Sequence, residues 1–349
     1  MNIGFYSPYL DTLGGGERYV FTLASHWSKM HSVSVFWNQS DILRNAQKRF
    51  NIDLSRIKVA RNIFGDTSVL KKLVLTRQYD LIFFLSDGSI PSTLAKYNIL
   101  HYQSPFGNIS YSPIKLTRYQ VVVCNSQFTK DALDRRIRGD ACVIYPPVSP
   151  VPTSRTKKEN IILSVGRFTG IHTAKKQHVL IESFTEGIKI KKWNGWKLVF
   201  AGGMMPGEEG YLNHLKDISR GLPIIFEPNI SFNKLTDYYL RARIYWHAAG
   251  FGESDPRFME HFGISTVEAM SVGVIPVVFH GGGQSEIVDH GTNGFLWTSR
   301  SDLIAKTTLL MTDNTLAETM QKNTVAKSKE FSVSRFCDSF DAILSKITL

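Results

Sequence analysis

Short apolar runs alternate with longer amphipathic stretches along the whole chain. The predicted strands cover residues 3–6, 33–37, 81–85, 99–102 and 121–125 in the first half, and residues 161–165, 197–201, 224–226, 244–247 and 275–279 in the second. Helical periodicity appears between many of them, for example over residues 17–29, 178–187 and 234–241. Strands that alternate with helices predict parallel sheets with helices on both faces.

A proline-rich segment interrupts this pattern. Prolines at positions 146, 147, 150 and 152 cannot continue a helix or a central strand. We therefore predict two doubly wound α/β domains, over residues 1–150 and 151–330. Residues 331–349 should form an amphipathic helix that packs back toward the N-terminal domain. Ligands of open α/β sheets bind outside the carboxyl ends of the strands, so the loops that follow strands are the places to seek chemistry.

The charge of the chain is uneven. Residues 1–155 contain 19 Lys and Arg against 10 Asp and Glu, whereas the remaining residues contain 22 against 20. A basic N-terminal half predicts an anionic partner, such as a phosphorylated lipid or an anionic membrane surface. A solvated basic face without a partner is the alternative. No recognised nucleic-acid-binding module accompanies the charge, so we expect no nucleic acid partner.

The three cysteines have no metal-site spacing and predict neither a disulfide framework nor a zinc site. We expect no metal and no other cofactor. The N-terminus lacks the basic segment and apolar core of a signal peptide, and no apolar run has the length of a membrane span. These features predict a cytoplasmic protein whose contact with a membrane is peripheral.

Two loops that follow strands have the residues of anion sites. Residues 14–16 are three glycines before a predicted helix, whose free N–H groups can face an anion. Arg167 follows the strand at 161–165, and Lys175 and Lys176 come soon after. Arginine with a nearby lysine can clamp a diphosphate. The alternatives are a plain turn for the glycines and solvated cations for the basic residues.

A third candidate segment contains two glutamates, Glu260 and Glu268. Their carboxylates could accept hydrogen bonds from sugar and ribose hydroxyls. The alternative for Glu268 is a capping box with Ser265 at the start of a helix, and for Glu260 a solvated loop position. A second glycine-rich turn follows at residues 281–283.

The order of these segments resembles the family 4 glycosyltransferases of the GT-B fold, in which two Rossmann-like domains face each other across a cleft. The resemblance covers nearly the whole chain. It rests on the glycine loop at residues 14–17, the strand end at 125–128, residues 165–168 with Lys175, the two glutamates, and residues 281–288 and 291–296. It implies a retaining glycosyltransferase that takes a hexose from a nucleotide diphosphate sugar. Because the residues show no metal-site pattern, we expect the transfer to be metal-independent, with Arg and Lys in place of a divalent ion.

The resemblance also implies roles for individual residues. Arg167 and Lys175 would hold the leaving diphosphate, Glu268 the ribose hydroxyls, and Glu260 the transferred sugar and the diphosphate. The remaining donor contacts would come from Gly15, Gly16, Phe262, Gly263, Ile264, Asn229 and Ile230.

Two departures from the family pattern leave alternatives open. The interval between Arg167 and the lysines is longer than usual, so either Lys175 or Lys176 could be the phosphate ligand. The family often supplies a histidine from the N-terminal domain to the catalytic cleft. Here either His101 or Gln103 could take that place, and a structural role is the alternative for the histidine.

The sequence at residues 260–264 resembles mannosyltransferases that build lipid-linked oligosaccharides. It therefore implies GDP-mannose as the donor, with a UDP-sugar as the alternative, and a glycan or polyprenyl-phosphate-linked acceptor. Candidate contacts with an anionic membrane are Arg44, Lys48, Arg49, Lys71, Lys72 and Arg77. A nucleotide-sugar epimerase of the same fold is the rival function, and a nucleic-acid-binding protein, which only the basic charge favours, is a further alternative.

Overall fold

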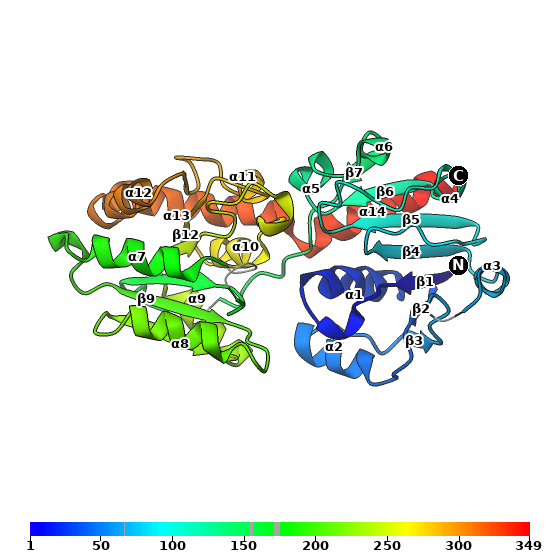
Figure 1. Ribbon diagram of the computed structural model, residues 1–349, viewed down its shortest axis with the longest axis horizontal. Coiled ribbons are helices and arrows are strands. Elements are labelled where there is room, and N and C mark those ends of the chain that lie inside the picture. The colour runs from blue at the N-terminus through cyan, green and yellow to red at the C-terminus, as the bar shows by residue number, and fades with distance from the viewer. Residues whose placement is uncertain (66, 154–155, 171–174) are drawn as a thin grey trace. The chain divides into compact units, whose positions relative to one another are not determined.

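The computed structural model describes residues 1–65, 67–153, 156–170 and 175–349, and it divides into two compact units (Figure 1). The N-terminal unit comprises Met1–Pro147 together with Val333–Leu349, and the C-terminal unit comprises Val148–Ser332. The sequence predicts boundaries after residues 150 and 330, and the two units of the structure divide after residues 147 and 332.

The N-terminal unit contains a seven-stranded parallel sheet in the order β3-β2-β1-β4-β5-β6-β7. Its strands are β1 (Asn2–Tyr6), β2 (Ser32–Phe36), β3 (Ile57–Ala60), β4 (Leu81–Ser86), β5 (Tyr97–Tyr102), β6 (Val121–Cys124) and β7 (Ala141–Val143). Its helices are α1 (Gly15–Trp27), α2 (Ile42–Phe50), α3 (Val69–Thr76), α4 (Pro113–Leu116), α5 (Gln127–Asp131), α6 (Arg135–Arg138) and α14 (Val333–Thr348).

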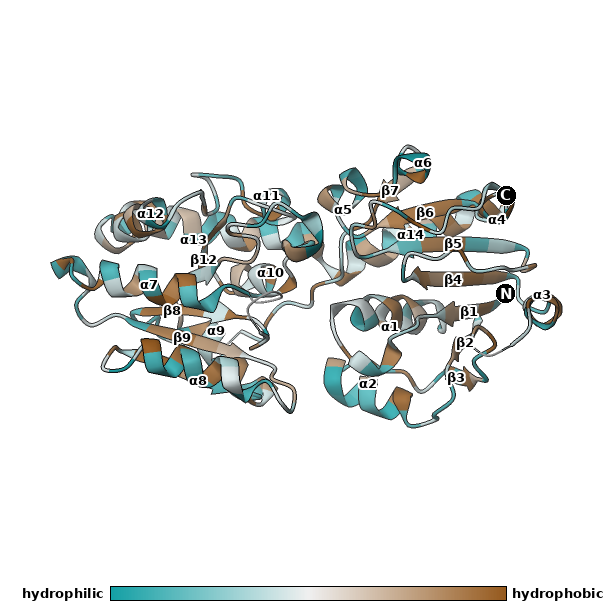
Figure 2. Cartoon of the chain, viewed as in Figure 1, coloured by the Kyte–Doolittle hydropathy of each residue, from teal (hydrophilic) through white to brown (hydrophobic). Residues whose placement is uncertain are grey.

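Both faces of this sheet are covered. Every residue of β4 is buried, and Figure 2 shows the strand in the brown of hydrophobic residues. Leu81 and Phe83 belong to a core cluster with α1, α2 and α14, whereas Ile82 and Phe84 belong to a second cluster on the opposite face. This separation follows from the alternation of side chains along a strand, and it explains why β4 is a continuous apolar run.

The last helix of the chain, α14, packs against α1 within the N-terminal unit. The Phe336 ring lies 4.7 Å from that of Tyr19, edge to face. Asp341 accepts a hydrogen bond from the Trp27 indole at 2.9 Å and pairs with the His26 ring at 2.7 Å. The apolar stripe of the helix is therefore buried against the first helix of the chain, with one polar anchor.

The C-terminal unit contains a six-stranded parallel sheet in the order β10-β9-β8-β11-β12-β13. Its strands are β8 (Ile161–Val165), β9 (Lys197–Gly202), β10 (Ile224–Pro228), β11 (Ile244–His247), β12 (Ile275–Phe279) and β13 (Phe295–Trp297). Its helices are α7 (Gln177–Gly187), α8 (Glu209–Ile218), α9 (Phe232–Arg241), α10 (Ile264–Ser271), α11 (Gln284–Ile287), α12 (Arg300–Thr312) and α13 (Asn314–Ser328).

The predicted fold class, two doubly wound parallel sheets, is confirmed. Three strands were not predicted, namely β3, β7 and β13, and each is an edge strand of its sheet. An edge strand is short and has one neighbour, so its apolar pattern is weak. Among the described residues, no helix is long and apolar enough to span a bilayer.

Candidate active site

The carboxyl end of β8 carries the cations of the predicted phosphate site. Gly166 and Arg167 follow the strand, and the Arg167 side chain is exposed. A Cβ atom at Gly166 would lie 2.7 Å from Cγ of Lys175, so glycine is needed for the lysine stem to pack on the strand end. This close approach brings Lys175 to the end of β8, although Lys175 lies ten positions beyond the last residue of the strand.

Glu260 is the centre of a network with Lys175 and His247. Its Oε2 atom lies 2.7 Å from Lys175 Nζ and 2.9 Å from His247 Nε2. The Glu260 side chain is only 16% exposed. Burial opposes its ionisation, but the Lys175 ammonium and the His247 hydrogen bond hold the pKa of Glu260 well below its ordinary value. Glu260 is therefore an ionised acceptor at neutral pH.

Lys176 contacts a different carboxylate. It precedes α7 in the left-handed conformation, with φ of 57°, and its Nζ atom lies 2.5 Å from Oε1 of Glu253. Left-handed backbone is costly for a residue with a side chain, and it occurs where the surroundings require it. The turn directs the two neighbouring lysines to separate partners, and the Lys175 side chain stays one third exposed.

Glu268 lies in the second turn of α10, where its Oε2 atom accepts a hydrogen bond from the Tyr239 hydroxyl at 3.1 Å. The helix begins after Gly263, which is its N-cap residue. Ser265 lies inside the helix and contacts the Tyr245 hydroxyl at 2.8 Å. The capping-box alternative for Glu268 is therefore wrong, because Ser265 is not the N-cap.

The glycine turn after β12 supports the loop that carries Glu260. Gly282 has φ of +63°, and a Cβ atom there would lie 2.1 Å from the Glu260 carbonyl oxygen. The Gly283 N–H donates to the same oxygen at 2.7 Å. The Phe262 ring is buried against Phe331, so this stretch offers a ligand its backbone rather than that ring. Ile264 follows as the first residue of α10.

Two of the predicted donor contacts, Asn229 and Ile230, follow β10. The Asn229 side chain accepts from the Met204 N–H at 2.8 Å and donates to the Met204 carbonyl at 3.0 Å. It therefore braces the loop after β9, and its amide is already engaged. Ile230, the next residue, is half-buried. Glu227, at the end of the strand, accepts from Lys234 and from Tyr238, both at 2.7 Å.

In the N-terminal unit, the glycine loop opens α1. Gly15 and Gly16 form the first turn of this helix, and Glu17 accepts from the Gly14 N–H at 2.8 Å. A Cβ atom at Gly16 would lie 2.2 Å from Oε1 of Gln103. The Nε2 atom of Gln103 is buried without a hydrogen-bond partner in the described part of the chain. The structure thus brings together two of the predicted donor contacts, Gly16 and Gln103.

The catalytic expectation for His101 needs correction. His101 is the fifth residue of β5 and is fully buried. Its ring stacks on Tyr19 at 4.1 Å and lies 5.6 Å from Phe83. Burial lowers its pKa to about 3, so the ring is neutral at ordinary pH. A side chain inside the core cannot touch a ligand, and Gln103, which follows the strand, is the half-exposed alternative.

Sequence reasoning missed His247, Glu253 and Tyr239, the partners of Glu260, Lys176 and Glu268. Each is separated from its partner by 13 or more residues, and no local motif indicates the contact. Among the described residues, no group of three His, Cys, Asp or Glu side chains could hold a metal ion.

Comparison with protein families matches both units. The family described as Glycosyl transferases group 1 matches residues 150–327, and Glycosyltransferase Family 4 matches residues 13–151. Among curated proteins, the human GDP-Man:Man(3)GlcNAc(2)-PP-Dol alpha-1,2-mannosyltransferase is 25% identical over 97% of this chain and 84% of its own length. The enzyme of the same name from Dictyostelium discoideum is 26% identical over 97% and 83%.

Solved structures share the fold. Anabaena Alr3699/HepE in complex with UDP has a TM-score of 0.75 at 19% identity, over 99% of both chains. Sucrose-phosphate synthase from Thermosynechococcus elongatus has a TM-score of 0.72 at 16% identity, over 100% of this chain and 99% of that one. These likenesses confirm the predicted GT-B fold.

Proposed function

This chain belongs to the group 1, family 4 glycosyltransferases, which are retaining enzymes that use nucleotide sugars, and we propose that it transfers mannose from GDP-mannose to a lipid-linked glycan. The observation that carries the proposal is the convergence of Lys175, Glu260 and His247 beside the exposed Arg167 at the end of β8.

The arrangement suits a departing diphosphate. Sugar transfer passes through an oxocarbenium-like state as negative charge grows on the leaving group. Arg167 and Lys175 would stabilise that charge more strongly than the ground state, in place of a metal ion. Glu260 would accept from hydroxyls of the sugar, and Glu268 from the ribose. Both glutamates are thus assigned to hydroxyl groups of the donor, so we propose same-face attack, in which the leaving phosphate accepts the acceptor's proton.

The donor is the first part of the proposal to test. The mannosyltransferase relatives are named for GDP-Man, whereas the HepE structures contain UDP or UDP-glucose, which makes a UDP-sugar the alternative. A ligand that binds the native protein raises its melting temperature. We expect the largest rise in melting temperature with GDP-mannose. When acceptor is added to the protein with GDP-mannose, GDP should be released. A rise with UDP-sugars alone would contradict the mannose assignment, and conversion of the donor without acceptor would favour an epimerase.

An anionic membrane surface is the second part. Residues 1–147 and 333–349 contain 20 Lys and Arg against 12 Asp and Glu, and the mannosyltransferase relatives act on a dolichol-linked acceptor. Helix α3 supports this proposal, since Leu70 is 78% and Val74 is 66% exposed beside the exposed Lys71 and Arg77. Exposed apolar side chains flanked by cations suit a lipid interface.

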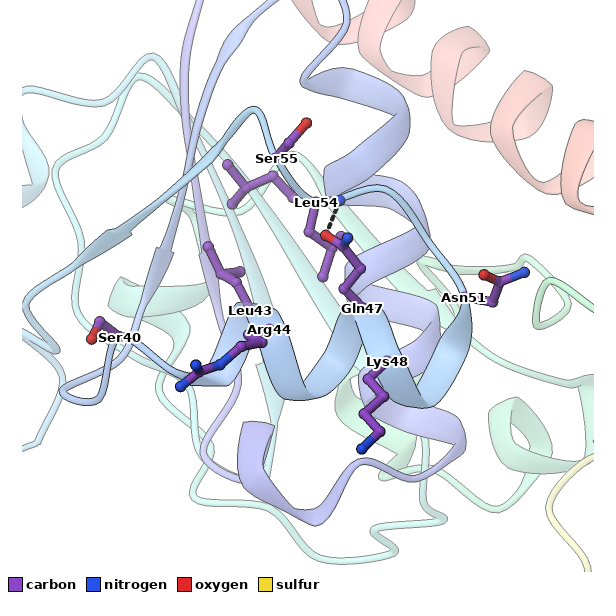
Figure 3. A pocket seen from close by; sticks show the side chains of 9 residues that line it. Ser40, Leu43, Arg44, Gln47, Lys48, Asn51, Leu54 and Ser55 are labelled. Atoms are coloured by element: carbon purple, nitrogen blue, oxygen red, sulfur yellow. Dashed lines mark hydrogen bonds between the residues drawn. The ribbon is translucent and has the colours of Figure 1, made fainter. Parts of the chain in front are cut away.

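The other predicted membrane contacts are less suited to insertion. Lys72 of α3 donates to the Phe64 carbonyl oxygen at 3.1 Å, so its ammonium group is already engaged within the protein. Helix α2 contains Arg44, Lys48 and Arg49. It borders an open groove of about 660 Å³, which is also lined by Gln47 and by the segment that follows the helix (Figure 3). The exposed face of α2 is polar, so it would contribute charge alone.

Liposome flotation tests the membrane part. Binding should rise with the fraction of anionic lipid and fall with salt. It should weaken when Lys71 and Arg77 become Glu, and also when Leu70 and Val74 become Ser. The matched control replaces Lys191 and Lys192 of the C-terminal unit with Glu, which should leave binding nearly unchanged. Failure to bind anionic liposomes at low salt would contradict this part, while leaving the catalytic part intact.

A further inference from the structure

His247 occupies a position beside Glu260 that no sequence motif indicates. It is the last residue of β11, its side chain is 2% exposed, and its neighbour in the adjacent strand is Val278. Its Nε2 atom lies 2.9 Å from Glu260 Oε2. Its Nδ1 atom is buried and has no hydrogen-bond partner in the described ranges, so Glu260 is the polar anchor of the ring.

The same carboxylate oxygen receives two donors. Glu260 is ionised and can only accept, so His247 donates its Nε2–H. Lys175 donates to the same Oε2 at 2.7 Å. The other oxygen, Oε1, accepts no hydrogen bond from any described residue. The chain therefore fixes one oxygen of the carboxylate and leaves the other for a ligand.

Lys175 has two competing anions once a nucleotide is bound. A diphosphate carries more negative charge than one carboxylate, and the ammonium should move toward it. Removal of one partner from a largely buried ion pair is strongly unfavourable because the remaining charge stays desolvated. Glu260 would suffer this cost unless another donor remained in place.

We propose that His247 is a positioning residue that keeps the Glu260 carboxylate in place while Lys175 exchanges from Glu260 to the diphosphate of a bound nucleotide. This inference rests on the proposed function, because it requires a nucleoside diphosphate at the end of β8. In the nucleotide-bound protein, His247 would be the remaining hydrogen-bond donor to Glu260. His247 would therefore influence the affinity for the nucleotide as well as the stability of the fold.

The supports of both residues are independent of Lys175. Strand β11 lies between β8 and β12 inside the sheet, and His247 itself pairs with Val278 of β12. The Glu260 carbonyl oxygen accepts from the Gly283 N–H at 2.7 Å. The contact between His247 and Glu260 can therefore persist when the lysine leaves.

A double-mutant cycle tests the inference. Calorimetry would give the affinity for GDP and for UDP of wild type, His247→Leu, Lys175→Ala and the double variant. With Lys175 present, His247→Leu should weaken binding about tenfold to a hundredfold, because Glu260 has neither donor in the bound state. With Lys175→Ala, the added His247→Leu should change affinity little, because Glu260 lacks the lysine in both the free and the bound protein.

Two further variants separate this role from packing. His247→Gln keeps an N–H donor and should restore most of the affinity. Val278→Ala removes buried volume beside His247 without touching Glu260, so it should lower the melting temperature and leave affinity unchanged. Equal losses from His247→Leu in both backgrounds, or no loss in either, overturn this inference alone. If wild type binds neither nucleotide, the proposed function is wrong and the inference falls with it.

Discussion

Lys175→Ala should damage both catalysis and stability. It removes the ammonium 2.7 Å from Glu260 and leaves a carboxylate of 16% exposure with His247 as its remaining donor. The lysine is partly exposed and one donor remains, so the cost in unfolding free energy should be about 1–3 kcal/mol, less than for a fully buried pair. Loss of a charge at the leaving group should lower turnover about 100- to 1,000-fold.

The matched controls are Arg167→Ala and Lys176→Ala, assayed by donor turnover and by thermal melting monitored by circular dichroism. Arg167 is exposed and forms no ion pair with any described residue, so its removal should lower turnover without lowering the melting temperature. Lys176→Ala breaks the pair with Glu253 and should lower the melting temperature, with turnover within about tenfold of wild type. Near-normal turnover in Arg167→Ala, or greater damage from Lys176→Ala than from Lys175→Ala, would refute the assignment of the phosphate ligands.

Three further outcomes follow from the structure. Glu268→Gln should weaken nucleotide binding by about 1.5–3 kcal/mol in calorimetry, because it removes a charged acceptor; a lower melting temperature with unchanged affinity would indicate a purely structural role. His101→Phe should retain activity. Wild type should lose stability as the pH falls from 6.5 toward 3, and melting measured across pH should show that the variant lacks this contribution. The sign follows because burial lowers the folded pKa, so below pH 6.5 the unfolded state binds the extra proton. Phe340→Ala should cost about 3–5 kcal/mol in denaturant unfolding, because its fully buried ring packs on Trp27; a cost under 1 kcal/mol would contradict the docking of α14 on α1.

The sequence by itself determined the central elements of both sheets and the loops that hold the cations and the glutamates. Central strands such as β4 are continuous apolar runs, because both of their faces are buried, and this pattern is visible without a structure. Arg167 and Glu268 are also predicted locally as ligand contacts, each from adjoining residues, and both roles stay predictions. Three of the four edge strands, β3, β7 and β13, were not predicted, because one neighbour and partial exposure leave little apolar signal.

Tertiary structure alone decided which side chains meet. Lys175 and Glu260 are 85 residues apart, and their contact depends on β11 lying beside β8 in the sheet order. The same order places His247 against Glu260. For His101, the local pattern was misleading. A polar residue near a strand end is typical of a ligand contact, but the pleat of β5 directs this side chain into the core, where it stacks on Tyr19. Periodicity specifies that a strand exists, but strand order and side-chain direction arise from packing between distant segments, and that packing determines the chemistry of the site.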